Sequence, residues 1–250
     1  MRRIERATLP VVAQRYLDGR QSRLDADVAA GHADVERSWK DARKTKSVGG
    51  DERSVLSTLR QMSGTRHRCM YCLDSHGCDI EHFRPKAVYP ERAFRWSNLL
   101  LCCTECGRFK GDRFPVSGAD PLLIDPSAED PWVYLDFDPD TGNIGPRFDV
   151  ASGDWSVKGR RTVDTLRLDR REALSQGHLV TFRRLAEVVH QELARQPAPL
   201  LESLLRDLRA ADDHGLLPWC FGPAGRAVEP FQSLCNRFPD LWAQCAAHSA

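Results

Sequence analysis

The sequence predicts an α+β protein in which a small, cysteine-rich module of mixed helix and strand is embedded between mostly helical N- and C-terminal regions. Two observations predict this class. Residues 1–66 and 151–250 are helical in pattern, whereas residues 67–150 combine cysteine, proline and glycine with short strand-like runs. We therefore expect three parts with these boundaries.

The N-terminal region is polar, with breaks at Gly31 and at Gly49-Gly50 and a basic stretch at residues 40–46. The C-terminal region contains two stripes of apolar residues at helical spacing. The stripes either bury against each other within the chain or dock another subunit. They comprise Phe182, Leu185, Ala186, Val189 and Leu193, then Leu200, Leu201, Leu204, Leu205 and Leu208.

Between these regions, strand-like runs cover residues 79–83, 98–103 and 132–138, and a turn signal follows at residues 139–143. Successive side chains on a strand point to opposite faces, so Glu81 and His82 of the first run point apart. These two neighbours can share a site only where the strand twists or ends.

At 250 residues the chain is long enough for one large core, or for one core with a small appended module. Arg6, Pro10 and Gln14 interrupt the apolar residues near its start, so we expect no signal peptide there. No run elsewhere approaches the roughly 20 apolar residues of a membrane-spanning helix. We therefore expect a cytoplasmic protein with no membrane association.

The net charge of +1 hides an uneven distribution. Residues 84–113 carry three acids against seven basic residues, which are Arg84, Lys86, Arg92, Arg95, Arg108, Lys110 and Arg113. One explanation is a solvated face. The other is the attraction of a negatively charged phosphodiester to this segment.

Nine cysteines are many for a cytoplasmic protein, where disulfides are rare and clustered cysteines indicate metal binding or catalysis. Cys69 and Cys72 form one CxxC pair, and Cys103 and Cys106 form a second. Two such pairs can supply the four thiolates of a tetrahedral, structural zinc site. The alternative is a set of unligated thiols in the core.

Other cysteines and histidines near these pairs have simpler explanations. We expect Cys78 and Cys102 to pack beside the zinc. His67 and His76 flank the first pair and could replace a cysteine ligand, but we expect them at the surface. The three cysteines of the C-terminal region are typical buried apolar residues.

The two cysteine pairs enclose an acid–histidine string that contains Asp79, Glu81 and His82. Hydrolysis of a phosphodiester needs an attacking water, a base with a pKa near neutrality, and a hard cation held by oxygen ligands. A histidine beside a carboxylate supplies the base and the ligand. An exposed strand that carries salt bridges is the alternative explanation.

Three runs carry a family resemblance: CMYCLDSHGCDIEHFRPK, RWSNLLLCCTEC and KGDRFP. They resemble the HNH endonuclease superfamily, and within it the branch that includes the HNH subunit of the Septu anti-phage defence system. The resemblance covers residues 69–126 and implies a zinc-stapled ββα-metal (HNH) module. It implies that His82 is the general base, that Glu81 binds the catalytic metal, and that Asn98 orients the base. The implied ligands of the structural zinc are Cys69, Cys72, Cys103 and Cys106.

The chain departs from the family pattern directly after the second cysteine pair. The family usually has His or Asn there, as a second ligand of the catalytic metal, whereas this chain has Gly107. Glycine has no side chain to coordinate an ion. Asp79 or Asp112 could substitute as hard oxygen ligands, although neither occupies the matching position.

The predicted function is a metal-dependent endonuclease that hydrolyses the phosphodiester bonds of nucleic acid, with DNA favoured and Mg²⁺ or Mn²⁺ as the catalytic metal. The alternative is a zinc module that binds nucleic acid or a partner protein, its chemistry weakened by the loss at position 107. The resemblance to the Septu branch further implies a partner ATPase. The predicted phosphate contacts are Arg84, Lys86, Arg108 and Lys110.

Overall fold

The computed structural model describes residues 1–50, 52–195 and 200–249. The chain folds into two compact units. The N-terminal unit is Ile4–Glu129, and the C-terminal unit is Asp130–Ala250 together with Met1–Arg3. The predicted division into residues 1–66, 67–150 and 151–250 stays a prediction. None of the helices in the described part of the chain is both long and apolar enough to cross a membrane.

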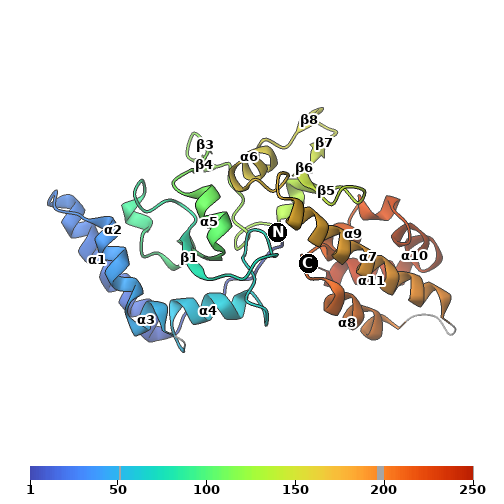
Figure 1. Cartoon of the computed structure of the whole chain (residues 1–250), viewed down its shortest axis with the longest axis horizontal. Coiled ribbons are helices and arrows are strands. Elements are labelled where there is room, and N and C mark those ends of the chain that lie inside the picture. Colours follow the sequence, from blue (N-terminus) through green and yellow to red (C-terminus); the bar gives the residue numbers. More distant parts are fainter. Residues whose placement is uncertain (51, 196–199, 250) are drawn as a thin grey trace. The chain divides into compact units, whose positions relative to one another are not determined.

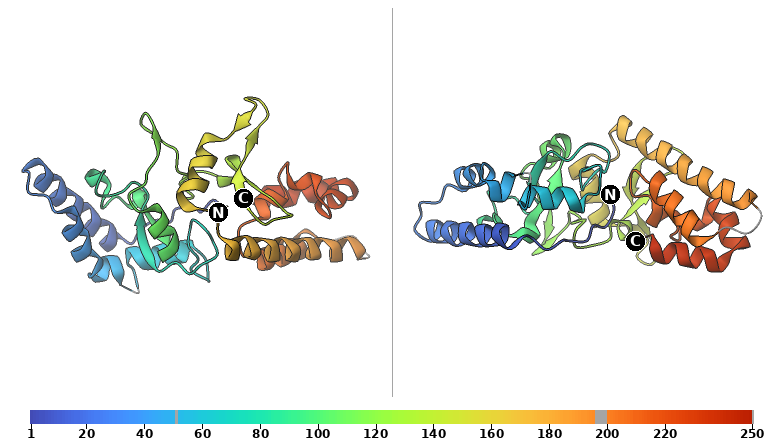
Figure 2. Two further views of the ribbon diagram at one scale, coloured as in Figure 1. Left: turned by 45° about the horizontal axis from the view of Figure 1, so that its top comes forward. Right: turned by 90° about the horizontal axis from the view of Figure 1, so that it is seen from below.

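The N-terminal unit begins with helices whose ends are set by local capping. Asp34 accepts a hydrogen bond from the Arg37 N–H at 2.9 Å and starts α2, and Ser54 forms a reciprocal capping box with Ser57 at the start of α4. Helix α1 contacts both α2 and α3, and Figures 1 and 2 show these three helices together within the unit. The helices are α1 (Val11–Ala29), α2 (Val35–Arg43), α3 (Lys46–Gly49) and α4 (Val55–Met62).

The rest of this unit is built on a two-stranded antiparallel sheet, β1 (Asp79–His82) and β2 (Leu99–Cys102), followed by α5 (Thr104–Lys110). Two strands of the predicted runs are therefore present, and the order β1, β2, α5 is ββα. The three leucines of β2 are fully buried, and α4 packs on this strand. Short elements complete the unit: η1 (Pro90–Arg92), η2 (Trp96–Asn98), β3 (Val116–Ser117) and β4 (Asp120–Pro121).

The C-terminal unit begins with short strands and continues as helices. The predicted turn at residues 139–143 joins β5 to β6, and Asp138 accepts hydrogen bonds from the backbone of Asp140 and Thr141 within it. The strands and helix of the first part are η3 (Pro131–Val133), β5 (Leu135–Phe137), β6 (Ile144–Pro146), β7 (Phe148–Asp149), β8 (Asp154–Trp155) and α6 (Val157–Leu166). The elements that follow are α7 (Glu172–Ala194), α8 (Leu201–Ala211), α9 (Leu217–Cys220), η4 (Gly225–Ala227), α10 (Phe231–Arg237) and α11 (Pro239–His248).

The apolar stripes of the C-terminal unit pack against each other within the chain. Helix α7 contacts α8 and α10, and α11 contacts α8 and α10. Leu185 and Val189 of α7, and Leu204 and Leu208 of α8, are fully buried. Leu200, just before α8, is 73% exposed and lies outside this core. These observations confirm the prediction of an α+β protein with a helical C-terminal region.

Candidate functional site

Four cysteine side chains meet in the interior of the N-terminal unit. Their Sγ atoms all lie within 4.8 Å of one another, and all four residues are buried. Cys69 and Cys72 belong to the turn before β1, and Cys103 and Cys106 to the start of α5. The predicted grouping of the two CxxC pairs is therefore present in the fold.

The backbone around each pair places the thiols. Cys103 is the N-cap of α5, and its Sγ accepts a hydrogen bond from the Cys106 N–H at 3.4 Å. The first pair turns tightly, because the Leu73 N–H donates to the Cys69 carbonyl at 2.9 Å and Leu73 takes a left-handed φ of 56°. The Met70 N–H donates to the Leu101 carbonyl, which ties this turn to β2.

The cysteine cluster fits a zinc ion in size and chemistry. Four thiolates about 2.3 Å from a central zinc lie about 3.8 Å from one another at the corners of a tetrahedron. The Cys72 and Cys103 sulfurs are 3.9 Å apart. A metal ion such as zinc could be held here, where it would supply structural support rather than chemistry.

The neighbouring thiols and histidines stay outside this set of four. The Cys102 sulfur is buried 4.0 Å from that of Cys69 and donates to the Cys103 carbonyl, whereas Cys78 is exposed. The rings of His67 and His76 lie 6.1 Å apart, near each other rather than in the cluster.

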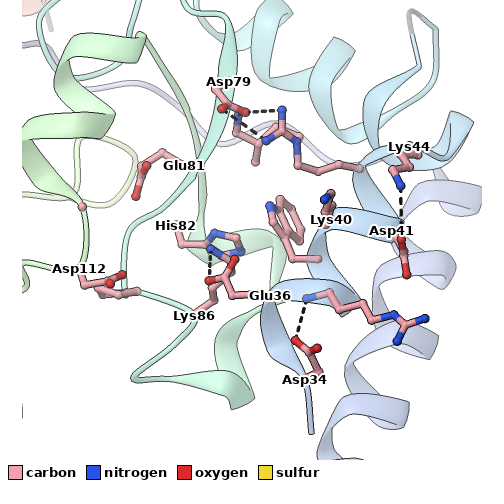
Figure 3. A pocket seen from close by; sticks show the side chains of 16 residues that line it. Asp34, Glu36, Lys40, Asp41, Lys44, Asp79, Glu81, His82, Lys86 and Asp112 are labelled. Carbon is pink, nitrogen blue, oxygen red and sulfur yellow. Dashed lines mark hydrogen bonds and ion pairs between the residues drawn. The ribbon is translucent and has the colours of Figure 1, made fainter.

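A pocket of about 1030 Å³ opens in the same unit. It is lined by β1, by α2 and by the loops after β1 and α5, and it brings together Asp79, Glu81, His82, Lys86 and Asp112. Figure 3 shows Glu81 and Asp112 on the side of the pocket away from α2. All four residues of β1, Glu81 and His82 among them, line the pocket, although the side chains of Glu81 and His82 have different partners.

His82 is held in one orientation and in its neutral form. It is 4% exposed, and the Trp39 ring of α2 packs edge-on against it with centroids 4.4 Å apart. Burial, followed by the positive charge of Lys86, lowers the pKa of His82 to about 3. Its Nε2 lies 2.9 Å from the Ala93 carbonyl oxygen, which can only accept, so Nε2 carries the proton. In this neutral ring Nδ1 keeps the free lone pair.

Asn98 acts on the loop that holds His82 rather than on the imidazole itself. Its Oδ1 accepts from the Arg84 N–H at 2.8 Å, and its Nδ2 donates to the carbonyls of Arg84 and Arg92, each at 3.0 Å. Arg92 directly precedes Ala93, the acceptor of His82. Asn98 therefore positions the histidine through the backbone.

Glu81 points to α5 and is paired with a lysine. The Lys110 Nζ lies 2.9 Å from Glu81 Oε1, and the lysine side chain is completely buried. Burial raises the pKa of Glu81, and the Lys110 ammonium opposes that rise. A Cβ placed on Gly107 would lie 3.5 Å from Glu81 Oε2, so position 107 faces the carboxylate, as the family resemblance implies.

Asp79 and Asp112, the two acids proposed to replace the missing ligand, line the pocket but do not form a metal site with Glu81. Asp79 is paired with Arg43 of α2 at 2.8 Å, and Asp112 is exposed beyond the end of α5. Among the described residues, one group of three or more Cys, His, Asp or Glu side chains converges tightly enough to hold an ion. That group is the cysteine cluster. The acids of the pocket do not form such a set.

The four predicted phosphate contacts have four different environments. Lys86 lines the pocket and pairs with Glu36 at 2.9 Å. Arg84 stacks on the rings of Tyr89 and Phe114, with centroid distances of 5.3 and 5.2 Å. Arg108 is exposed, and Lys110 is buried against Glu81 instead of facing solvent.

Helix α2 contributes residues that the sequence did not assign to the site. Arg37, Lys40 and Arg43 of α2 and its C-cap Lys44 line the same pocket as His82. Figure 3 shows Lys40 and Lys44 across the pocket from Glu81. The basic stretch at residues 40–46 was the signal for Lys40, Arg43 and Lys44, whereas Arg37 lies before it. It could not be connected to His82, which lies about 40 residues further along the chain, before the fold was known.

The chain is similar to two curated proteins. It is 28% identical to Septu protein PtuB of Bacillus thuringiensis over 144 residues, which cover 56% of this chain and 50% of that protein. It is 31% identical to Septu protein PtuB of Bacillus mycoides (strain KBAB4) over 153 residues, which cover 48% of each chain. The chain thus spans about half the length of these relatives, and it matches no protein-family model.

Proposed function

We propose that this chain is an HNH-type endonuclease that hydrolyses the phosphodiester bonds of nucleic acid, with DNA as the favoured substrate, and that it acts in anti-phage defence. The observation that carries the proposal is the fixed, neutral His82 in a pocket that also holds Glu81 and basic side chains from α2. The ββα order beside a four-cysteine cluster supports it. The similarity to Septu protein PtuB supports the role in defence.

In the proposed reaction, the free lone pair of His82 Nδ1 accepts a proton from water. The water oxygen bonds to phosphorus as the bond from phosphorus to the 3′ oxygen breaks, and the leaving oxygen takes a proton from solvent. A pKa of about 3 makes the unliganded imidazole a weak base. A bound phosphodiester would bring negative charge beside His82 and Lys86, and this raises the proton affinity of the ring.

The resemblance also implies Mg²⁺ or Mn²⁺ at Glu81, and the pocket as it stands does not fit such an ion. Divalent magnesium and manganese need several oxygen ligands in one place. Here Asp79 is paired with Arg43, position 107 is glycine, and Glu81 is paired with Lys110. The proposed steps therefore rest on this chain's own residues.

The test is a plasmid-nicking assay of purified protein, run without added metal and with Mg²⁺ or Mn²⁺. We expect His82→Ala to lower cleavage by at least 100-fold, the usual contribution of a general base. His32→Ala is the matched control, because His32 is an exposed histidine of the same unit that does not line the pocket. Equal activity of the wild type and His82→Ala, in preparations free of other nucleases, would overturn the assignment.

A second candidate is a zinc module that binds nucleic acid or a partner protein without cleaving. Gly107 and the Glu81–Lys110 pair favour it, because both remove features that support metal-dependent cleavage. The two candidates separate in one experiment. Nucleic-acid binding by gel shift, with no nicking under any metal condition, would support this candidate over the nuclease.

We further propose that the chain works with a partner ATPase, as the Septu branch implies. The pocket offers a limited basic surface, and a nuclease in a cell needs its timing controlled from outside. Co-purification from a host that expresses the neighbouring genes, with cleavage assayed in the presence and absence of the co-purified protein, tests this. Full and specific cleavage by the isolated chain would count against it.

A further inference from the structure

Lys110 is buried, which is unusual for a lysine beside a pocket proposed to bind nucleic acid. Its side chain is completely buried, its Nζ lies 2.9 Å from Glu81 Oε1, and it also donates to the Gly111 carbonyl at 3.3 Å. An ammonium removed from water is strongly destabilised unless it is paired and hydrogen-bonded. Glu81, whose side chain is 21% exposed, is the acidic partner that makes this burial tolerable.

The geometry of α5 explains how the lysine reaches the carboxylate. Residues 107 and 110 are three positions apart, so they lie on the same face of the helix. With glycine at 107, the space beside Glu81 Oε2 holds no side chain from that position, while Oε1 is taken by Lys110. Position 107 therefore offers no ligand to an ion, and Lys110 on the same face supplies a positive charge.

We propose that Lys110 is the resident cation of Glu81, and that its ammonium keeps divalent ions from this carboxylate. A divalent ion on Glu81 would lie close to the buried ammonium, and like charges at short range in a poorly solvated interior repel strongly. No side chain at 107 offers the ion a compensating ligand. This inference deepens the proposed function by naming the cation of the site, but its test measures metal binding and not cleavage.

The test measures Mn²⁺ affinity by electron paramagnetic resonance on the full chain loaded with zinc. For Lys110→Met we expect Mn²⁺ to bind at least tenfold more tightly than to the wild type, because a buried carboxylate without a cation attracts one. Mn²⁺ should also raise the Tm of this variant and leave that of the wild type unchanged. The double variant Lys110→Met with Glu81→Gln should lose both effects.

The matched control is Lys44→Met, which removes an exposed lysine that lines the pocket. Lys44 is 68% exposed and pairs with Asp41 at 3.6 Å, so its loss leaves no buried carboxylate and should leave the Mn²⁺ affinity within twofold of the wild type. Zinc content and Tm verify that each variant is folded. If Lys110→Met does not fold, Lys110→Gln serves in its place, because the amide keeps the contact with Glu81 without the charge.

A second measurement is independent of any change at Lys110. Glu81→Gln in the otherwise wild-type chain should leave the Mn²⁺ affinity unchanged within twofold, because the ion does not use this carboxylate while Lys110 is present. A tenfold loss of affinity would overturn the proposal, as would a Lys110→Met chain that binds Mn²⁺ no better than the wild type. The absence of nicking would count against the nuclease function alone, so the two failures are distinguishable.

Discussion

The cysteine cluster and the pocket are attached to the same two-stranded sheet, yet they are built in opposite ways. The cluster collects four identical groups, all buried and all directed at one point. The pocket collects acids and bases that largely pair with one another, such as Asp79 with Arg43 and Lys86 with Glu36. The cysteine cluster is complete once its four ligands meet. The chemistry of the pocket depends instead on which side chain each charged group pairs with.

This difference determines how each region should respond to substitution. Metal binding by the four cysteines is coupled to folding, because the binding free energy at a structural metal site adds to the stability of the fold. A pocket of paired charges loses one interaction at a time. Removing a group from the cluster should therefore cost more stability than removing a group from the pocket.

The largest effect is expected for Cys103→Ser. This variant should lose the bound metal and more than about 5 kcal/mol of stability, because the four-sulfur shell is broken. The control is its neighbour, Cys102→Ser, which alters a buried thiol outside the set of four and should keep the metal at a cost of about 1–3 kcal/mol. Metal analysis and thermal unfolding measure both. If both variants lost the metal and the same amount of stability, Cys102 could not be distinguished from the four proposed ligands.

An intermediate effect is expected at Asn98. Asn98→Ala removes three hydrogen bonds to the backbone of the loop after β1, worth about 1 kcal/mol each, so we expect a loss of about 3 kcal/mol in urea unfolding. Asn98→Asp should cost at least as much, since a carboxylate would face the carbonyls of Arg84 and Arg92. The exposed neighbour Ser97→Ala should be close to neutral. An aspartate variant as stable as the wild type would contradict the role of Asn98 as a backbone clamp.

The smallest effect concerns a histidine of the C-terminal unit that resembles His82. His178 Nδ1 donates to the Gly142 carbonyl at 2.9 Å, and burial, with a contribution from nearby positive charge that includes His214, lowers its pKa to about 3. The unfolded chain binds this proton near pH 6.5, so His178 contributes stability that is complete above pH 6.5 and is lost as the pH falls toward 3.

Between pH 7.5 and pH 5 this loss amounts to about 2 kcal/mol, at 1.36 kcal/mol for each unit of pKa difference titrated. His178→Gln should remove that part of the pH dependence in urea unfolding. His190→Gln, at an exposed position of the same helix, is the control and should keep the wild-type dependence. A His178→Gln chain with an unchanged pH profile would show that burial does not hold this imidazole neutral, and it would weaken the parallel argument for His82.

The sequence alone predicted the two halves of the cysteine cluster. Residues at i and i+3 converge on one ion through local backbone geometry, so the spacing of Cys69 with Cys72 and of Cys103 with Cys106 predicts two half-sites, and only their meeting needs the fold. The strands at residues 79–83 and 98–103 were predictable for the same reason, because alternation and β-branched or apolar content are local signals. The helical stripes of α7 and α8 were predictable as helices, but their mutual packing was one of two alternatives.

The tertiary structure decided the partners of the charged groups. Lys110 was predicted from the sequence to contact phosphate and is buried on Glu81 instead, because the fold brings the end of α5 beside this carboxylate. Asn98 holds the loop rather than the imidazole, and α2, from a distant part of the chain, supplies Trp39 against His82 and a basic wall to the pocket. Local spacing determines which groups share a turn, but the pairing of charges depends on long-range packing, and only the folded chain brings those segments together.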